Sequence, residues 1–378
     1  MTEEYPFLDV SAVKLIQMKV PCVFLKPIEI GAWIWKMIHL SKKIVCMMMT
    51  AVVVLALFSH LHLAFADTAT DVWDGTSVAK GFASGSGTAE DPFIIRTAAQ
   101  LMYFRNHVNA TKNAYQGKHI LLDADIDLNH KTFGDPIGSD TRPFYGHFDG
   151  NGHRVINMKM ESGVYFVGLF GYVVEATIEN VTIENSLVKA TAANANAGAL
   201  VGQGYGCRIS NCHNINTSVT KEDGTTRQNG VGGLIGLVGD NGSGSSLKNS
   251  IIENCTNSGN IRGYIRAGGI WGCSVGSTQT IACTNTGNIT GVDEAAGGIG
   301  GYDYGTGVIT KCANKQGNIK AVSTAGGIVG YAQYTQISRC YNTGSVTASG
   351  SCAGGICGSA NFSKSQQSPS KIATIPAP

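Results

Sequence analysis

The sequence predicts an all-β protein: a right-handed parallel β-helix with coils of 28–29 residues and a short N-terminal capping helix. Glycine occurs 49 times in 378 residues, nearly twice its ordinary usage, and only 14% of the residues are charged. Short glycine-containing strings recur at a fixed step along the second half. These apolar runs are short and lack helical periodicity, which excludes helical repeats.

The repeat is read most directly from two strings. The first ends in Cys-x-Asn, and after one longer gap its cysteines are spaced by 28, 29 and 28 residues. The second is a Gly-Gly string that keeps the same step. A fixed period of this length indicates a solenoid. The cysteines are Cys212, Cys255, Cys283, Cys312 and Cys340, and the glycine strings occupy 232–236, 268–272, 297–301, 326–330 and 354–358.

Stacking places equal positions of successive coils side by side. We expect three short strands in each coil, joined by tight arcs. The cysteines then form an inward column of small apolar side chains. The asparagines form a turn ladder in which stacked amides bond to one another and to the arc backbone. Glycines supply positive φ at the corners and allow neighbouring coils to approach closely. The predicted ladder contains Asn257, Asn285, Asn314 and Asn342.

A helix is expected within 92–109, before the repeats. Thr97 is a good N-cap, and Gln100 stands three residues later as its capping-box partner. A helix here would cover the first coil, whose edge is otherwise unpaired. The predicted buried face contains Leu101, Phe104 and Val108.

The chain divides into four predicted parts. Residues 42–66 follow the order of a secretory signal peptide: Lys42 and Lys43, then an apolar run, then Ala64-Phe65-Ala66. Met37 is a better start of the protein than Met1, because the signal peptide then has an ordinary length. An uncleaved membrane anchor over 44–66 is the alternative. The parts are 1–66, an extension plus signal peptide; 67–160, the cap and first coils; 161–358, the repeats; and 359–378, a disordered polar tail.

Here the sequence resembles a family. The repeat strings resemble the GLUG motif, and "GSGTAEDPFIIRTAAQLMYFRNHVN" with the segments that follow it resembles the leader found before GLUG repeats. The resemblance covers about 73–358. It implies a surface location and a right-handed parallel β-helix, as in adhesin-like proteins and the non-catalytic regions of IgA-cleaving metallo-endopeptidases. It assigns no activity, and the sequence contains no H-E-x-x-H zinc motif.

Acidic residues before the repeats suggest an alternative, enzymatic function. Segment 119–128 alternates apolar and acidic residues, which places Asp125 and Asp127 on an outward face. Asp149 and His153 flank the turn "DGNG" and could form an acid–base pair. Glycan cleavage needs two carboxylates close together. Turn formation remains the simpler interpretation.

Three further interpretations concern the repeats. Tyr302 and Tyr331 occupy equal positions in neighbouring coils, so they form either a sugar-binding face or a stacked pair that stabilises the sheet. Glu294 falls near Arg266 in register, which predicts a surface ion pair.

Most of the nine cysteines after residue 66 are expected to be buried thiols. The pair Cys352 and Cys357 is the best candidate for a disulfide.

Together these features predict an exported, non-enzymatic surface solenoid that serves as an adhesion or scaffold module. The alternative is a polysaccharide-active lyase or hydrolase. The expected location is secreted or on the surface of a bacterium, and the expected partner is a host or bacterial surface glycan or protein. A net charge of +2 without a basic stripe argues against nucleic acid. No cofactor or metal is expected, and membrane contact is expected only through an uncleaved signal segment.

Overall fold

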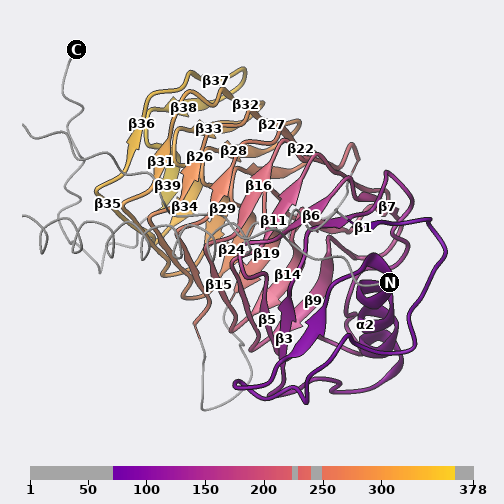
Figure 1. Ribbon diagram of the computed structural model, residues 1–378. Coiled ribbons are helices and arrows are strands. Elements are labelled where there is room, and N and C mark those ends of the chain that lie inside the picture. The colour runs from indigo at the N-terminus through magenta and orange to yellow at the C-terminus, as the bar shows by residue number, and fades with distance from the viewer. Residues whose placement is uncertain (1–70, 224–228, 240–248, 362–378) are drawn as a thin grey trace, which may run out of the picture. The chain divides into compact units, whose positions relative to one another are not determined.

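The computed structural model describes residues 71–223, 229–239 and 249–361, which wind into one parallel β-solenoid with a short helix near its N-terminal end (Figure 1). This confirms the predicted architecture and coil length. The expected signal segment lies outside the described residues. No helix among the described residues is long and apolar enough to cross a membrane.

Five parallel sheets run along the solenoid, two of nine strands and three of seven. Sheet A contains β1 (Asp71–Val72), β4 (Ile126–Asp127), β6 (Arg154–Ile156), β11 (Thr182–Glu184), β16 (His213–Ile215), β21 (Thr256–Asn257), β26 (Thr284–Asn285), β31 (Ala313–Asn314) and β36 (Tyr341–Asn342). Sheet B contains β2 (Phe93–Ile95), β3 (His119–Leu122), β5 (His147–Asp149), β10 (Thr177–Glu179), β15 (Arg208–Ser210), β20 (Ile251–Glu253), β25 (Gln279–Ile281), β30 (Val308–Thr310) and β35 (Gln336–Ser338).

The other three sheets complete each coil. Sheet C contains β7 (Lys159–Ser162), β12 (Leu187–Ala190), β17 (Ser218–Thr220), β22 (Ile261–Gly263), β27 (Ile289–Gly291), β32 (Ile319–Ala321) and β37 (Val346–Ala348). Sheet E contains β8 (Phe166–Val167), β13 (Asn196–Gly198), β18 (Val231–Gly232), β23 (Arg266–Gly268), β28 (Ala295–Gly297), β33 (Thr324–Gly326) and β38 (Cys352–Gly354). Sheet D contains β9 (Phe170–Val174), β14 (Val201–Tyr205), β19 (Ile235–Gly239), β24 (Trp271–Val275), β29 (Gly300–Tyr304), β34 (Val329–Gln333) and β39 (Cys357–Asn361).

A full coil therefore has five short strands, and the expectation of three was wrong. The chain visits the sheets in the order B, A, C, E, D, as in β25 to β29. Sheets B and A are separated by a corner of only two residues, which the sequence pattern does not reveal as a break. Strand β39 ends at Asn361, so strand pairing continues past the predicted end of the repeats at Gly358.

The corner between sheets B and A adopts left-handed backbone at one residue per coil. The φ angles there are 55° at Asn180, 52° at Asn211 and 53° at Asn254, and asparagine tolerates this region better than most residues do. In the described residues, none of the Gly-Gly glycines has positive φ. The prediction that glycine supplies positive φ at the corners therefore fails between sheets B and A, but it holds between sheets D and B at Gly206 (58°) and Gly276 (75°). The corner position continues with Ala282 (54°), Lys311 (57°) and Arg339 (53°).

The asparagine ladder is present inside the solenoid. Asn257 Nδ2 donates to Asn285 Oδ1 at 2.7 Å, Asn285 donates to Asn314 at 2.8 Å, and Asn314 donates to Asn342 at 2.7 Å. Each amide nitrogen also donates to a glycine carbonyl of its own coil, at 2.8–3.0 Å. The first three amides are fully buried. Because buried polar groups are costly unless they are bonded, the ladder ties each coil to the next.

Glycines line both sides of this ladder. A Cβ added at Gly298 would lie 2.2 Å from the Gly327 carbonyl oxygen and 2.7 Å from Cβ of Asn314. A Cβ at Gly287 would lie 2.0 Å from the Gly259 carbonyl oxygen. These distances confirm the predicted close approach, and they explain why the glycine columns keep step with the asparagines.

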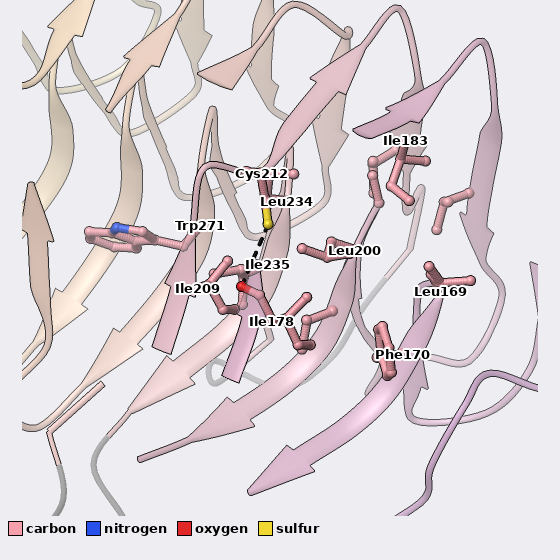
Figure 2. Packing of buried hydrophobic residues seen from close by; sticks show 14 of the residues in the cluster. Leu169, Phe170, Ile178, Ile183, Leu200, Ile209, Cys212, Leu234, Ile235 and Trp271 are labelled. Atoms are coloured by element: carbon pink, nitrogen blue, oxygen red, sulfur yellow. Dashed lines mark hydrogen bonds between the residues drawn. The ribbon is translucent and has the colours of Figure 1, made fainter. Parts of the chain in front are cut away.

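The cysteine column is buried beside the ladder, as predicted. Figure 2 shows Cys212 among the apolar side chains of the core, with its thiol donating to the Ile178 carbonyl at 3.6 Å. Burial raises the pKa of the Cys212 thiol well above its usual range, so the thiol stays protonated and can donate. All nine described cysteines are free, including Cys352 and Cys357, whose disulfide the structure does not form.

Helix α2 (Ala98–Ala110) covers the first coils. Its N-cap is Thr97, and Thr97 and Gln100 form both bonds of the predicted capping box. Phe104 is fully buried and packs against the rings of Phe144 and Phe148, at centroid distances of 5.6 and 6.0 Å. The predicted helix, cap and buried face are all confirmed.

We expect Gly298→Ala to lower the free energy of unfolding by about 2 kcal/mol, because the new methyl group would overlap the next coil and the ladder. Gly81→Ala is the matched control, since a Cβ there meets nothing within 4 Å and should change stability by less than about 0.5 kcal/mol. Urea denaturation of both variants checks this. Equal stabilities would show that the close approach is unimportant.

Candidate functional site

The first candidate site lies beside strands β4, β6 and β11, on the outer face of the N-terminal coils. Asp125 Oδ2 accepts from Arg154 Nη2 at 2.6 Å and from Nε at 2.9 Å, and Arg154 Nη1 donates to Glu184 at 3.0 Å. Burial alone would raise the pKa of Asp125, but the hydrogen bonds and charge of Arg154 outweigh burial and lower the pKa. Asp125 is thus an ionised carboxylate held by a neighbouring coil, not a proton donor.

The other predicted acids hold turns. Asp149 Oδ1 accepts from the backbone N–H of Asn151 at 2.7 Å and from Asn180 Nδ2 in the next coil at 2.9 Å. Asp127 makes the equivalent pair of bonds with Asn129 N–H and Asn157 Nδ2, at 2.7 and 2.9 Å. Their bonds match the turn interpretation of these residues.

His153 contacts Asp125 rather than Asp149. Its Nδ1 lies 3.3 Å from Asp125 Oδ1, and its backbone N–H donates to the Gly150 carbonyl at 2.7 Å to close the turn. The turn therefore points the imidazole toward the preceding coil. The structure therefore brings two of the four predicted residues into contact, Asp125 and His153, and this pairing differs from the predicted pair of Asp149 and His153.

Sequence reasoning missed a neighbouring pair on sheet B. His147 Nε2 lies 2.6 Å from Glu179 Oε1, and both side chains are about a quarter to a third exposed, at 30% and 26%. Glu179 stands opposite Asp149 in the strand register, so two carboxylates of neighbouring coils share this outer face. Aligning the first coils by strand register, rather than by motif, would have revealed this pair.

The tyrosine pair on sheet D is stacked over a buried cation. The rings of Tyr302 and Tyr331 are 4.2 Å apart with an interplanar angle of 19°. The Arg266 guanidinium carbon lies 4.1 Å from the centroid of the Tyr302 ring. Arg266 belongs to the coil before Tyr302, whereas Tyr331 belongs to the coil after it. Both faces of Tyr302 are therefore covered, which favours a stabilising stack over a sugar platform.

Arg266 is fully buried, so its predicted surface ion pair needs correction. Its Nε lies 3.1 Å from Glu294 Oε2, and it also donates to Tyr304 Oη at 2.5 Å and to Cys273 Sγ at 3.5 Å. A buried guanidinium is tolerated only with several partners of this kind. Glu294 remains partly exposed, at 29%.

Asp303 is a buried carboxyl on the inner side of β29. Its Oδ2 accepts from Thr335 Oγ1 at 2.7 Å, whereas its Oδ1 has no hydrogen-bond partner among the described residues. Gly307 makes room for it, because a Cβ there would lie 2.4 Å from Oδ2. Burial raises the pKa of Asp303 to about 7, so this side chain titrates near neutral pH.

No group of three or more His, Cys, Asp or Glu side chains in the described part of the chain is arranged to hold a metal ion. The parallel β-solenoid and its repeats define the class of protein. Two segments of the chain, residues 228–262 and 321–347, match the GLUG motif, so the solenoid contains GLUG repeats, as the sequence resemblance implied.

Two curated relatives share part of this sequence. The chain is 36% identical over 133 residues to a protein of Evansella cellulosilytica described as "Putative Gly-rich membrane protein", which covers 33% of this chain and 15% of that protein. It is 34% identical over 178 residues to Halomucin of Haloquadratum walsbyi, covering 44% of this chain and 2% of Halomucin. The chain thus spans a small fraction of the length of these relatives.

A solved structure shares the fold. It is described as "a putative immunoglobulin A1 protease from Bacteroides ovatus", and it matches with a TM-score of 0.60 and 24% identity. The match covers 74% of this chain and 87% of the other. At this identity the likeness establishes the solenoid architecture alone.

Asp303 should make stability depend on pH. Its pKa is about 7 in the folded chain and about 3.9 when unfolded. The folded state therefore binds more protons between these values, and the contribution of Asp303 to stability falls as pH rises from about 4 to 7, by about 4 kcal/mol. Asp303→Asn should remove this dependence and stabilise the chain above pH 7.

Denaturation of the parent and Asp303→Asn at several pH values measures the difference directly. Asp123→Asn is the control, because Asp123 is a partly exposed partner of Arg96. A stability difference between the parent and Asp303→Asn that stays constant from pH 4 to 8 would contradict the assignment.

Proposed function

We propose that this chain is an exported, non-enzymatic solenoid that acts as an adhesion or scaffold module at a bacterial surface. The observation that carries the proposal is that the candidate acidic residues form hydrogen bonds between coils. Asp125, Asp127 and Asp149 each accept hydrogen bonds from a side chain of the following coil, so they join coils together. None of these three carboxylates is free of partners, as the general acid of a glycan hydrolase would need to be in order to donate its proton.

The architecture supports a scaffold role. Each coil adds about 4.8 Å of length, the spacing of neighbouring strands. Repeats can therefore extend a rigid rod while its outer side chains vary. Seven of the nine described cysteines are buried, which shields their thiols outside the cytoplasm.

The relatives support an extracytoplasmic location. One carries the words "Gly-rich membrane protein" and the other the name Halomucin. Both names fit the signal-peptide pattern predicted before the solenoid. These names support the proposed location outside the cytoplasm. A host or bacterial surface glycan or protein is the partner that we propose for it.

A polysaccharide-active enzyme is the second candidate. It is favoured by one observation, the register pairing of Asp149 with Glu179 beside His147. Neighbouring strands are about 4.8 Å apart, which is close to the separation of about 5 Å between the two carboxyl groups of retaining glycosidases. This site would lie on sheet B of the N-terminal coils.

We expect the full chain to be retained by at least one surface polysaccharide or protein and to create no new chain ends in a panel of host and bacterial polysaccharides. Reducing-end and unsaturated-end assays, with retention on the immobilised panel, measure both. New ends that disappear in the double variant Asp149→Asn/Glu179→Gln would contradict the proposal and assign an enzyme. Glu161→Gln, whose partner Lys189 lies on sheet C, is the matched control.

A further inference from the structure

The two last coils described carry an unbalanced group of cations on sheet A and its corner. We call Lys311, Lys315, Arg339 and Tyr341 the basic corner. All four side chains are exposed, Tyr341 by 48%. None of the three cations forms an ion pair with a described residue. The surrounding segments 308–317 and 336–345 contain no Asp or Glu.

Lys311 and Arg339 occupy the strained corner position. Their φ angles are 57° and 53°, in the left-handed region that costs an ordinary residue roughly 1–2 kcal/mol. Asn180, Asn211 and Asn254 fill the same position in earlier coils, where asparagine bears the strain more easily, and Ala282 fills it in the coil before Lys311. The left-handed backbone therefore gives no reason for a lysine and an arginine here.

The same two residues also repel each other. The Lys311 N–H donates to the Ser338 carbonyl, so Lys311 stacks beside Arg339 in the next coil. Stacked positions are about 4.8 Å apart, and like charges at that spacing are destabilising. Positions that combine backbone strain with charge repulsion are often functional, because stability alone would not retain such residues.

The opposite charges that could relieve this repulsion lie elsewhere. Glu253 pairs with Arg208, and Glu294 pairs with Arg266. Asp303 is buried, and Asp293 lies between sheets C and E. These are all the acidic residues in 249–361. The basic corner is therefore available for an external anion.

We propose that the basic corner binds an anionic polysaccharide, a specific form of the surface adhesion proposed above. A linear polymer with an acidic group on successive sugars can offer one anion to each coil. The exposed Tyr341 ring, in the coil of Arg339, can pack against the apolar face of a sugar. Three cations on a narrow strip suit such a chain better than duplex DNA, which is usually bound through a wider basic surface.

The test uses the corner geometry to separate binding from folding. In the full chain, Lys311→Asn/Arg339→Asn removes two charges and installs the residue that earlier coils use. We expect unchanged or higher thermal stability and at least about tenfold weaker binding to polygalacturonate or dextran sulfate. Arg262→Asn/Lys320→Asn removes the same charge from exposed positions on sheet C and should retain binding within about twofold.

Affinity electrophoresis through gels containing each polymer measures these changes. Retention by the carboxylated or the sulfated polymer identifies the anion preferred, and retention should fall as salt rises. The proposal is overturned if neither polymer retains the parent, if both double variants lose binding equally, or if uncharged dextran, duplex DNA or anionic vesicles bind as strongly. New chain ends would instead overturn the non-enzymatic function, whereas lost retention alone would not.

Discussion

Buried amides stacked from coil to coil are the interaction on which this structure depends. Asn257, Asn285 and Asn314 each donate both to the next amide and to their own arc. The arrangement needs glycine on either side, because a methyl group at Gly287 or Gly298 would collide with neighbouring coils. A buried amide without these partners would be costly. The period of the repeat is therefore fixed by polar bonding as well as by apolar packing.

Because the interior provides the cohesion, the outer face is free to differ along the solenoid. In the N-terminal coils, acids such as Asp125 and Asp149 join one coil to the next. In the later coils, the ladder performs that role and outer charges are few. Lys311 and Arg339 are exceptions in these later coils. They place two cations at a corner where backbone strain and charge repulsion weaken the fold. Function is best sought where the outer surface departs from what stability requires.

The sequence correctly predicted which residues stack at equal positions of successive coils. It did not predict which of these stacked positions contact one another. The cysteine and asparagine columns were correct because identical residues at a fixed period must stack. The three-strand coil was wrong because one left-handed residue, such as Asn254, turns the chain without a visible break. Burial of Arg266 was missed because its partners Glu294 and Tyr304 come from the next coil, 28 and 38 residues away in the sequence. Likewise, no sequence pattern around Asp303 predicts that its carboxyl group is buried in the space left by Gly307.

A double-mutant cycle on Asn285→Ala and Asn314→Ala tests the ladder most directly. Their amides are bonded and buried, so the losses in stability should couple by about 1 kcal/mol or more. Asn260 and Asn288 provide the control, since their amides are bonded at 3.2 Å but exposed and should couple weakly. Additive losses at the buried pair, or equal coupling at both pairs, would contradict the central place given to the ladder.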